Sequence, residues 1–237
     1  AFTGWSGACS GTSTCTVNMT AAQSVTATFV PTYALTLSNS GTGTITSSPS
    51  GYGCTTSSCT VSVNSGTAVT LTAVPGTGYA FTGWSGGTCS GTSTTCAVTM
   101  SAAKSVTATF VPTYVMTLSY TGSGSITSSP TGYGCTTSPC TYTLNNNTAV
   151  TLTASPASGY VFTGWGGACS GTGTCAVTMS AAKTVTATFV ATYTLSEAIS
   201  GTGSISSSPT GYSCSAASCS YTANSGTSIV LTATPGT

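Results

Sequence analysis

Short stretches of the chain alternate apolar and hydroxyl side chains. Residues 69–73 read VTLTA, residues 25–29 read VTATF, and residues 16–19 read TVNM. A period of two predicts half-buried strands that turn their apolar side chains inward. Clusters of Gly, Ser, Pro and Asn separate these stretches, for example at 40–43 and 64–66, and predict turns. The pattern therefore predicts an all-β fold with little or no helix.

The same segments recur in the same order with a period of about 80 residues, which is typical of a repeat protein. The FTGW string ends at Trp5, Trp84 and Trp165, and each copy is followed by two cysteines and a VTATF segment. This self-similarity predicts a tandem array of small β-modules. We expect residues 1–32 to be the C-terminal part of a repeat, 33–113 and 114–192 to be complete repeats, and 193–237 to be the N-terminal part of a repeat.

The alternation predicts about seven short strands in each complete repeat. In residues 33–113 they fall near 33–38, 43–48, 60–63, 67–74, 79–84, 96–100 and 105–111. The inward positions, with their equivalents in the other copies, form the predicted core: Phe81, Trp84, Phe110, Val106, Met100, Val98, Leu71, Val69, Ile126 and Leu118. An exposed aromatic stripe that binds a ligand is the alternative for the Trp and Phe positions.

The twelve cysteines form six close pairs. The gaps within three of these pairs vary, which is unlike the fixed spacing of a zinc knuckle. Four cysteines in one repeat permit three connectivities, and we favour pairing within each close pair. Such disulfides in small polar repeats indicate an oxidising compartment. The predicted bonds join Cys9 to Cys15, Cys54 to Cys59, Cys89 to Cys96, Cys135 to Cys140, Cys169 to Cys175 and Cys214 to Cys219.

Charge is almost absent from the sequence. Lys104, Lys183 and Glu197 are the only charged side chains among 237 residues, and there is no Asp, Arg or His. Two lysines cannot neutralise a row of phosphates, so we expect neither nucleic acid nor an anionic membrane surface as a partner. No apolar run approaches the length of a spanning helix, so we expect no membrane insertion.

The residue types also argue against catalysis. A nucleophilic Ser or Thr needs a base, and paired-carboxylate chemistry needs two acids. We therefore expect no enzyme activity and no catalytic, cofactor or metal site. Glu197 stands where Leu37 and Leu118 stand in the other copies. We interpret it as an edge or register irregularity, with a buried functional acid as the alternative. Lys104 and Lys183 lack a repeated acid partner for an isopeptide bond, so we expect them to be solvated.

One series of residues resembles a known family. The string FTGW followed by Cys89, Cys96, Met100, Lys104 and Phe110, with its equivalents across the chain, is similar to the divergent internalin B-type repeat of bacterial surface proteins. The resemblance implies compact extracellular β-modules, in long arrays on secreted or wall-associated proteins, that act as stalks, spacers or adhesive elements. It also implies a β-grasp-like module as an alternative to a β-sandwich.

These observations predict a structural role outside the cell. Near-zero net charge and strand edges without charged gatekeepers favour association with like molecules. We expect head-to-tail assembly into a filament, fibre or surface stalk, in which 193–237 and 1–32 complete one another, between copies or along one continuous chain. The alternative is an adhesin array that binds glycans or a protein of a host or neighbouring cell.

Overall fold

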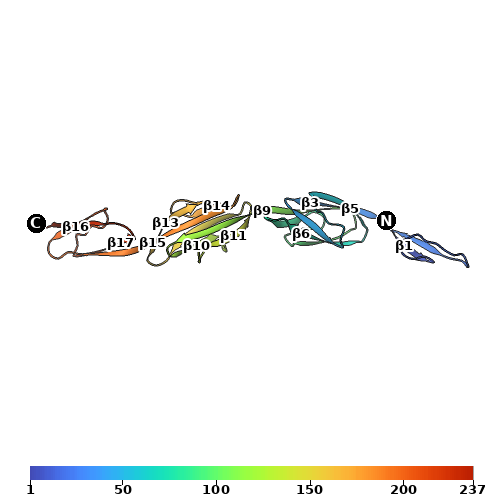
Figure 1. Ribbon diagram of the computed structural model, residues 1–237, viewed down its shortest axis with the longest axis horizontal. Coiled ribbons are helices and arrows are strands. Elements are labelled where there is room, and N and C mark those ends of the chain that lie inside the picture. Colours follow the sequence, from blue (N-terminus) through green and yellow to red (C-terminus); the bar gives the residue numbers. More distant parts are fainter. Residues whose placement is uncertain (237) are drawn as a thin grey trace. The chain divides into compact units, whose positions relative to one another are not determined.

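The computed structural model describes residues 1–236 and places them in the strands β1 to β18 (Figure 1). Thr237, the last residue of the expected segment 193–237, lies outside the described residues. The chain divides into two compact units, Ala1–Thr113 and Tyr114–Thr237. No helix, and hence no helix that could cross a bilayer, occurs between residues 1 and 236. The predicted all-β class is therefore confirmed.

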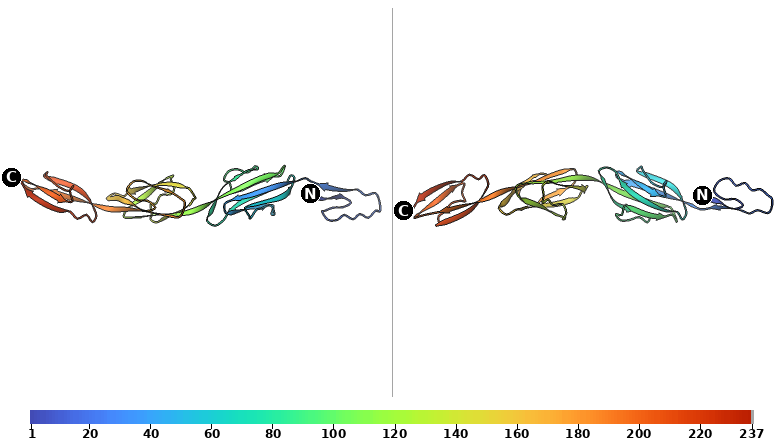
Figure 2. Two further views of the ribbon diagram at one scale, coloured as in Figure 1. Left: turned by 90° about the horizontal axis from the view of Figure 1, so that it is seen from above. Right: turned by 60° about the horizontal axis from the view of Figure 1, so that its bottom comes forward.

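Residues 33–113 form two sheets. The larger has the strand order β5-β3-β9-β7 and the smaller the order β4-β6-β8, and both can be followed in blue and green in Figure 2. Each of the seven predicted strands is present, although β9 continues past residue 111. The bounds are β3 Thr32–Ser40, β4 Gly43–Ser48, β5 Ser58–Asn64, β6 Ala68–Pro75, β7 Tyr79–Ser85, β8 Thr95–Thr99 and β9 Lys104–Thr121.

The core of these residues lies between the two sheets. In the larger sheet β3 and β9 run parallel, whereas β5 and β7 pair antiparallel with them on the outside. Leu37 and Phe110 of this sheet share one buried cluster with Ile45 and Leu71 of the smaller sheet. Two sheets that bury their inner faces against each other make a β-sandwich. The β-grasp alternative needs a helix across the sheet, and residues 1–236 contain none.

Within residues 33–192 the predicted core is buried except at the position of Phe81 and its equivalent Phe162, whereas several equivalents in residues 1–32 and 193–236 are exposed. Phe81 is only partly buried and packs against the side of the cluster. Trp84 is buried, and its Nε1 donates a hydrogen bond to the carbonyl oxygen of Ser93 at 2.8 Å. Since Trp165 is buried in the same way, these tryptophans belong to the core and do not form an exposed ligand platform.

Residues 114–192 repeat the same architecture. The sheets have the orders β11-β9-β15-β13 and β10-β12-β14, and β9 runs parallel to β15. A second buried cluster fills the space between them. The further bounds are β10 Gly124–Ser129, β11 Cys140–Asn145, β12 Ala149–Pro156, β13 Tyr160–Gly167, β14 Cys175–Thr178 and β15 Lys183–Ala198.

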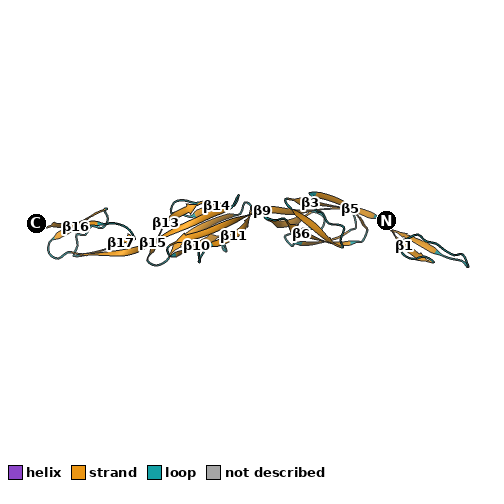
Figure 3. Ribbon diagram, in the orientation of Figure 1, coloured by secondary structure: helices purple, strands orange, loops and turns teal. Residues whose placement is uncertain are grey.

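The two remaining segments contain fewer strands (Figure 3). Residues 1–32 hold only β1 (Phe2–Gly7) and β2 (Val25–Phe29). Residues 193–236 hold the end of β15 together with β16 (Gly203–Ser208), β17 (Ser218–Asn224) and β18 (Val230–Pro235). We call 33–113 and 114–192 the two modules, 1–32 the back half and 193–236 the front half.

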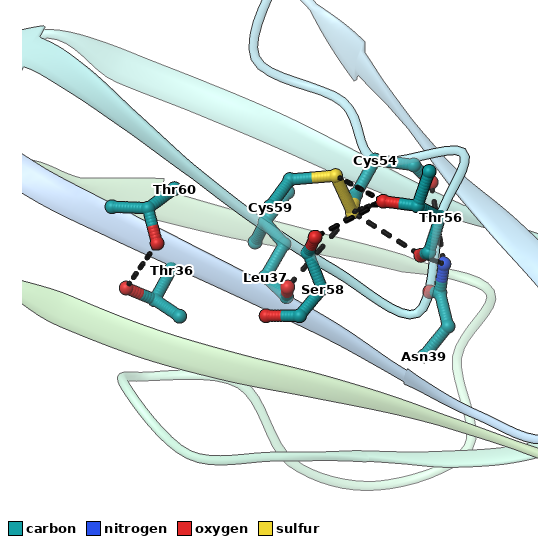
Figure 4. Close-up of a disulfide and its surroundings, with 8 residues drawn as sticks. All are labelled: Thr36, Leu37, Asn39, Cys54, Thr56, Ser58, Cys59 and Thr60. Carbon is teal, nitrogen blue, oxygen red and sulfur yellow. Dashed lines mark hydrogen bonds between the residues drawn. A yellow bond between two sulfur atoms is a disulfide. The ribbon is translucent and has the colours of Figure 1, made fainter.

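Six disulfides join the cysteines of each close pair, from Cys9–Cys15 to Cys214–Cys219. Figure 4 shows the bond between Cys54 and Cys59, which closes the loop before β5. The amide nitrogen Nδ2 of Asn39 donates a hydrogen bond to the carbonyl oxygen of Thr56 in this loop at 2.7 Å. Five of the six disulfides thus fasten a local loop to a strand, whereas Cys9 and Cys15 both lie outside strands.

Candidate assembly interface

The back half is a hairpin with the geometry that the same sequence has inside a module. β1 pairs with β2 in the register of β7 with β9 and of β13 with β15, including the shift that follows the first aromatic pair. The ring centroid of Phe2 lies 5.1 Å from that of Trp5 and 5.4 Å from that of Phe29. The equivalent distances from Phe81 in the first module are 5.2 and 5.8 Å. The hairpin is therefore already shaped to pack in a module.

Apolar side chains of the back half are exposed where their equivalents are buried. Phe29 is 71% exposed, whereas the equivalent Phe110 is 3% exposed. Met19 is 73% exposed, and the equivalent Met100 is fully buried. Full burial of a side chain of this size contributes about 1.5–3 kcal/mol. Within the described residues, these side chains thus lack the cover that their equivalents have in the modules.

The front half keeps the strand pairing of a module. β16 pairs with β18 as β4 pairs with β6, and β15 pairs with β17 as β3 pairs with β5. The bridge between Ile205 and Cys214 repeats the bridge between Ile45 and Cys54. Leu231, however, is exposed where Leu71 is buried. The front half thus keeps the pairing of the β3- to β6-type strands, but its inner face is open within the described residues.

A hollow in the front half marks the place that an aromatic ring occupies in the modules. A Cβ atom on Gly43 would lie only 2.6 Å from the ring of Phe110, so this glycine makes room for the ring. The three atoms nearest to a Cβ atom on the equivalent Gly203 are all backbone atoms, and none is aromatic. Residues 198–205 and 233–235 instead line a hollow of about 370 Å³. The hollow corresponds to the site of Phe110.

Strand edges that are paired in the modules are unpaired in the two halves. Within the described residues, β18 pairs only with β16 and β2 only with β1, and the end of β15 pairs only with β17. The modules fill the equivalent edges with β8 and with the parallel contact of β3 and β9. Unpaired N–H and C=O groups along such edges favour the addition of a strand. The back half carries the β7- and β9-type strands that the front half lacks.

Glu197 lies at the open edge of the front half. The register of β15 with β17 is unbroken from Thr192 to Ala198, so Glu197 is not a register irregularity. Its side chain is 6% exposed, and neither carboxylate oxygen has a hydrogen-bond partner within residues 1–236. A buried carboxylate without a donor is costly. Glu197 thus holds a buried carboxylate that has no hydrogen-bond donor among the described residues.

The lysines do not stand opposite an acid. Lys104 is in register with Leu35, and Lys183 is in register with Met116. This pairing offers no carboxylate for an isopeptide bond. No group of three or more His, Cys, Asp or Glu side chains that could hold a metal ion occurs in residues 1–236.

Comparison with known proteins places the repeats in a family. A family model described as a divergent InlB B-repeat domain matches residues 1–32, 33–113 and 115–192. Among solved structures, the chain is similar to the major pilin protein (T-13) of Streptococcus pyogenes, with 12% sequence identity, a TM-score of 0.25, and coverage of 68% of this chain and 97% of the pilin. A TM-score this low carries no argument. No curated protein matches the chain.

Proposed function

Because the chain belongs to the divergent InlB B-repeat family, we propose that it is a structural segment of a long extracellular bacterial protein whose repeats join head to tail. The joint forms when a back half completes a front half, either along one continuous chain or between two copies. Module boundaries at 32/33, 113/114 and 192/193 follow from this proposal. The resulting contact uses different surfaces on the two copies, so it builds an open filament unless the rotation closes a ring.

The observation that carries the proposal is the complementarity of the two halves. The front half has the β4-, β5- and β6-type strands in module register, and the back half has the β7- and β9-type strands in module register. The exposed Phe29 matches the hollow beside Gly203, because the equivalent Phe110 packs beside Gly43. Each half is already ordered, so joining them costs less conformational entropy than folding a disordered segment.

The chemistry of the chain fits a durable role outside the cell. Disulfides persist in oxidising compartments, and six of them fasten the loops of this chain. A near absence of charge leaves little repulsion between copies. The proposed role is not enzymatic, since Glu197 is the only acid in a sequence without His.

An adhesin array that binds glycans or a protein on another cell is the second candidate. It would gain support from aromatic rings exposed at the repeat period on the modules. Trp84 and Trp165 are buried instead. We therefore favour the structural role and leave ligand binding as an outcome of the experiment below.

The first prediction is that the chain of residues 1–237 forms polymers whose masses are multiples of 23.0 kDa. Light scattering behind size exclusion, over a concentration series, measures the masses, and electron microscopy shows the form. Phe29→Ser removes the ring that would fill the hollow and should give monomers. Val115→Ser is the matched control, since Val115 is an exposed apolar residue outside the joint.

Two results would overturn the proposal. One is a wild-type chain that stays monomeric up to its solubility limit. The other is polymerisation that Phe29→Ser and Val115→Ser weaken equally, since the contact would then not depend on the back half. A monomer that binds glycan arrays would favour the adhesin.

A further inference from the structure

The two sheets of the first module have four edges, and the fold covers them unequally. At the edge of β4, Ile45 and Cys54 exchange both backbone hydrogen bonds, at 2.8 and 2.7 Å. At the edge of β7, the N–H of Trp84 donates to the carbonyl oxygen of Gly91 at 2.9 Å. The edge strand β8 is only five residues long. β5 is longer and pairs only with β3 in the described residues, so its edge is the open one.

The register of β5 with β3 identifies the backbone groups that point away from the sheet. The N–H of Asn39 donates to the carbonyl oxygen of Ser57 at 2.9 Å, in line with this pairing. Hydrogen-bonded and non-hydrogen-bonded positions alternate along an antiparallel pair, so the odd-numbered residues of β5 bind β3. The N–H and C=O groups of Thr60 and Ser62 therefore face outward, and within residues 1–236 they have no backbone partner beyond the sheet.

The side chains along this edge do not oppose the addition of a strand. Residues 58–64 read SCTVSVN and contain neither a proline nor a charged residue. Proline and charge are two of the devices with which natural proteins protect an edge. Thr60 and Ser62 are exposed, whereas Val61 and Val63 pack on the core. An incoming strand would thus meet small hydroxyl side chains and free backbone groups.

The same edge recurs in the second module and in the front half. β11 is an edge strand beside β9, and β17 is an edge strand beside β15. Thr141 and Ser220 stand where β5 has Thr60. The second module has Pro139 in the place of Ser58, and its edge strand begins one position later. The middle of the edge, where the outward backbone groups lie, is nevertheless the same in all three copies.

We propose that the β5-type edge is a lateral docking surface, which pairs antiparallel with the same edge of a second copy of this chain. Antiparallel pairing of two identical strands is isologous, so a two-fold axis relates the copies. Thr60 of one copy would face Ser62 of the other, and the two residues would exchange both of their backbone hydrogen bonds. Two large sheets would then become one. This contact is independent of the head-to-tail joint proposed above.

The composition of the edge sets the partner and the strength of the contact. A second copy fits because the near absence of charge leaves little repulsion between like molecules. One edge buries little apolar surface, since the valines of β5 face inward. Single chains should therefore stay apart in dilute solution and associate only at high concentration. An array that carries the edge in each repeat gains from every further pair that its geometry lets it form.

Substitution at the outward positions tests the edge. In the Phe29→Ser chain, in which the head-to-tail joint is blocked, sedimentation equilibrium up to the solubility limit should detect weak association. Thr60→Pro, Thr141→Pro and Ser220→Pro together remove N–H groups that the sheets do not use, and should weaken it about tenfold or more. Valine at the same three positions removes the hydroxyl groups but keeps the N–H groups. This control should change the dissociation constant by less than about threefold.

Amide hydrogen exchange measured by NMR needs no substitution at the edge. The N–H groups of Thr60 and Ser62 should become more protected as the concentration of the Phe29→Ser chain rises. The N–H of Ala97 provides the control, because the register of β8 with β6 also turns it outward, but at the edge of a short strand. Its exchange should not depend on concentration.

The outcomes separate the lateral edge from the head-to-tail joint. A Phe29→Ser chain that does not associate up to its solubility limit would overturn the edge, and so would proline and valine variants that weaken association equally. Concentration-independent exchange at Thr60 and Ser62 would overturn it as well. None of these results depends on the joint, which the unsubstituted chain tests. Circular dichroism of each variant checks that the β-structure is unchanged.

Discussion

The back half and the matching residues 80–113 of the first module have nearly the same sequence, but they differ in strand formation and burial. CAVTM at 96–100 includes most of β8, whereas CTVNM at 15–19 forms no strand. Met100 is fully buried, whereas Met19 is 73% exposed. The difference is the presence of β6, which offers β8 an edge in the module. Strand formation here depends on a partner more than on the residues themselves.

In the front half the strands form although the core is open. β16 and β17 have the lengths of β4 and β5, because their partners β18 and β15 lie in the same segment, whereas β18 lacks a β8-type partner and begins two residues later than the equivalent β6. Leu231 is nevertheless exposed, because the sheet that would cover it is absent. Neighbouring strands can thus pair without a closed core, but burial requires both halves of the sandwich.

The largest expected effect comes from replacing the equivalent leucines of the first module and of the front half with alanine. Leu71→Ala should destabilise the first module by about 2–5 kcal/mol, since it leaves a cavity in a closed core. Leu231→Ala, made in the monomeric Phe29→Ser background, should change stability by about 0.5 kcal/mol or less. Hydrogen exchange of the β6 and β18 amides measures both effects. Equal losses at the two positions would show that the front half already has a closed core.

Removal of the equivalent disulfides of the first module and of the back half tests the same difference, with a smaller expected effect. Cys89→Ala with Cys96→Ala should lower the free energy of unfolding of the first module by about 2 kcal/mol, because the short loop is no longer closed in the unfolded chain. Cys9→Ala with Cys15→Ala should leave that module unchanged. Amide exchange across β6 to β9 again provides the measurement. An equal loss from the second pair would mean that the back half supports the module beside it.

Methionine oxidation gives the smallest expected effect and the simplest assay. Met19 should react with peroxide roughly tenfold faster than Met100, Met116 or Met179, because oxidation follows exposure and the last three are fully buried. Peptide mass spectrometry over a time course gives the rates. In polymer fractions Met19 should become as protected as the others. Persistent oxidation of Met19 there would place the back half outside the joint.

The strands and the core of the modules could be predicted from the sequence because alternation records which side chains face inward. β6 at Ala68–Pro75, for example, agrees with the expected 67–74. The parallel contact of β3 with β9 could not be predicted, since alternation says nothing about which distant strands become neighbours. Long-range pairing decides the register, and register decides which residues face each other.

The candidate interface was predicted in outline only. Phe29 and Leu231, at core positions of the repeat, are exposed, as expected if residues 193–237 and 1–32 complete one another. Ile205, Phe2 and Trp5, also at core positions, are half-buried. The hollow beside Gly203 gave no signal in the sequence, because it depends on three-dimensional equivalence between copies of the repeat.

The parallel contact of β3 and β9 also decides how a module would respond to tension. These are its first and last strands, and they run side by side from the pair Leu35–Lys104 to the pair Ser40–Thr109. A pull on the two ends of the module would slide the strands past each other and load all of their hydrogen bonds at once. The strands would not be peeled apart one bond at a time. The disulfides enclose only local loops, so after rupture nearly the whole module could extend and absorb mechanical work before the next one gave way.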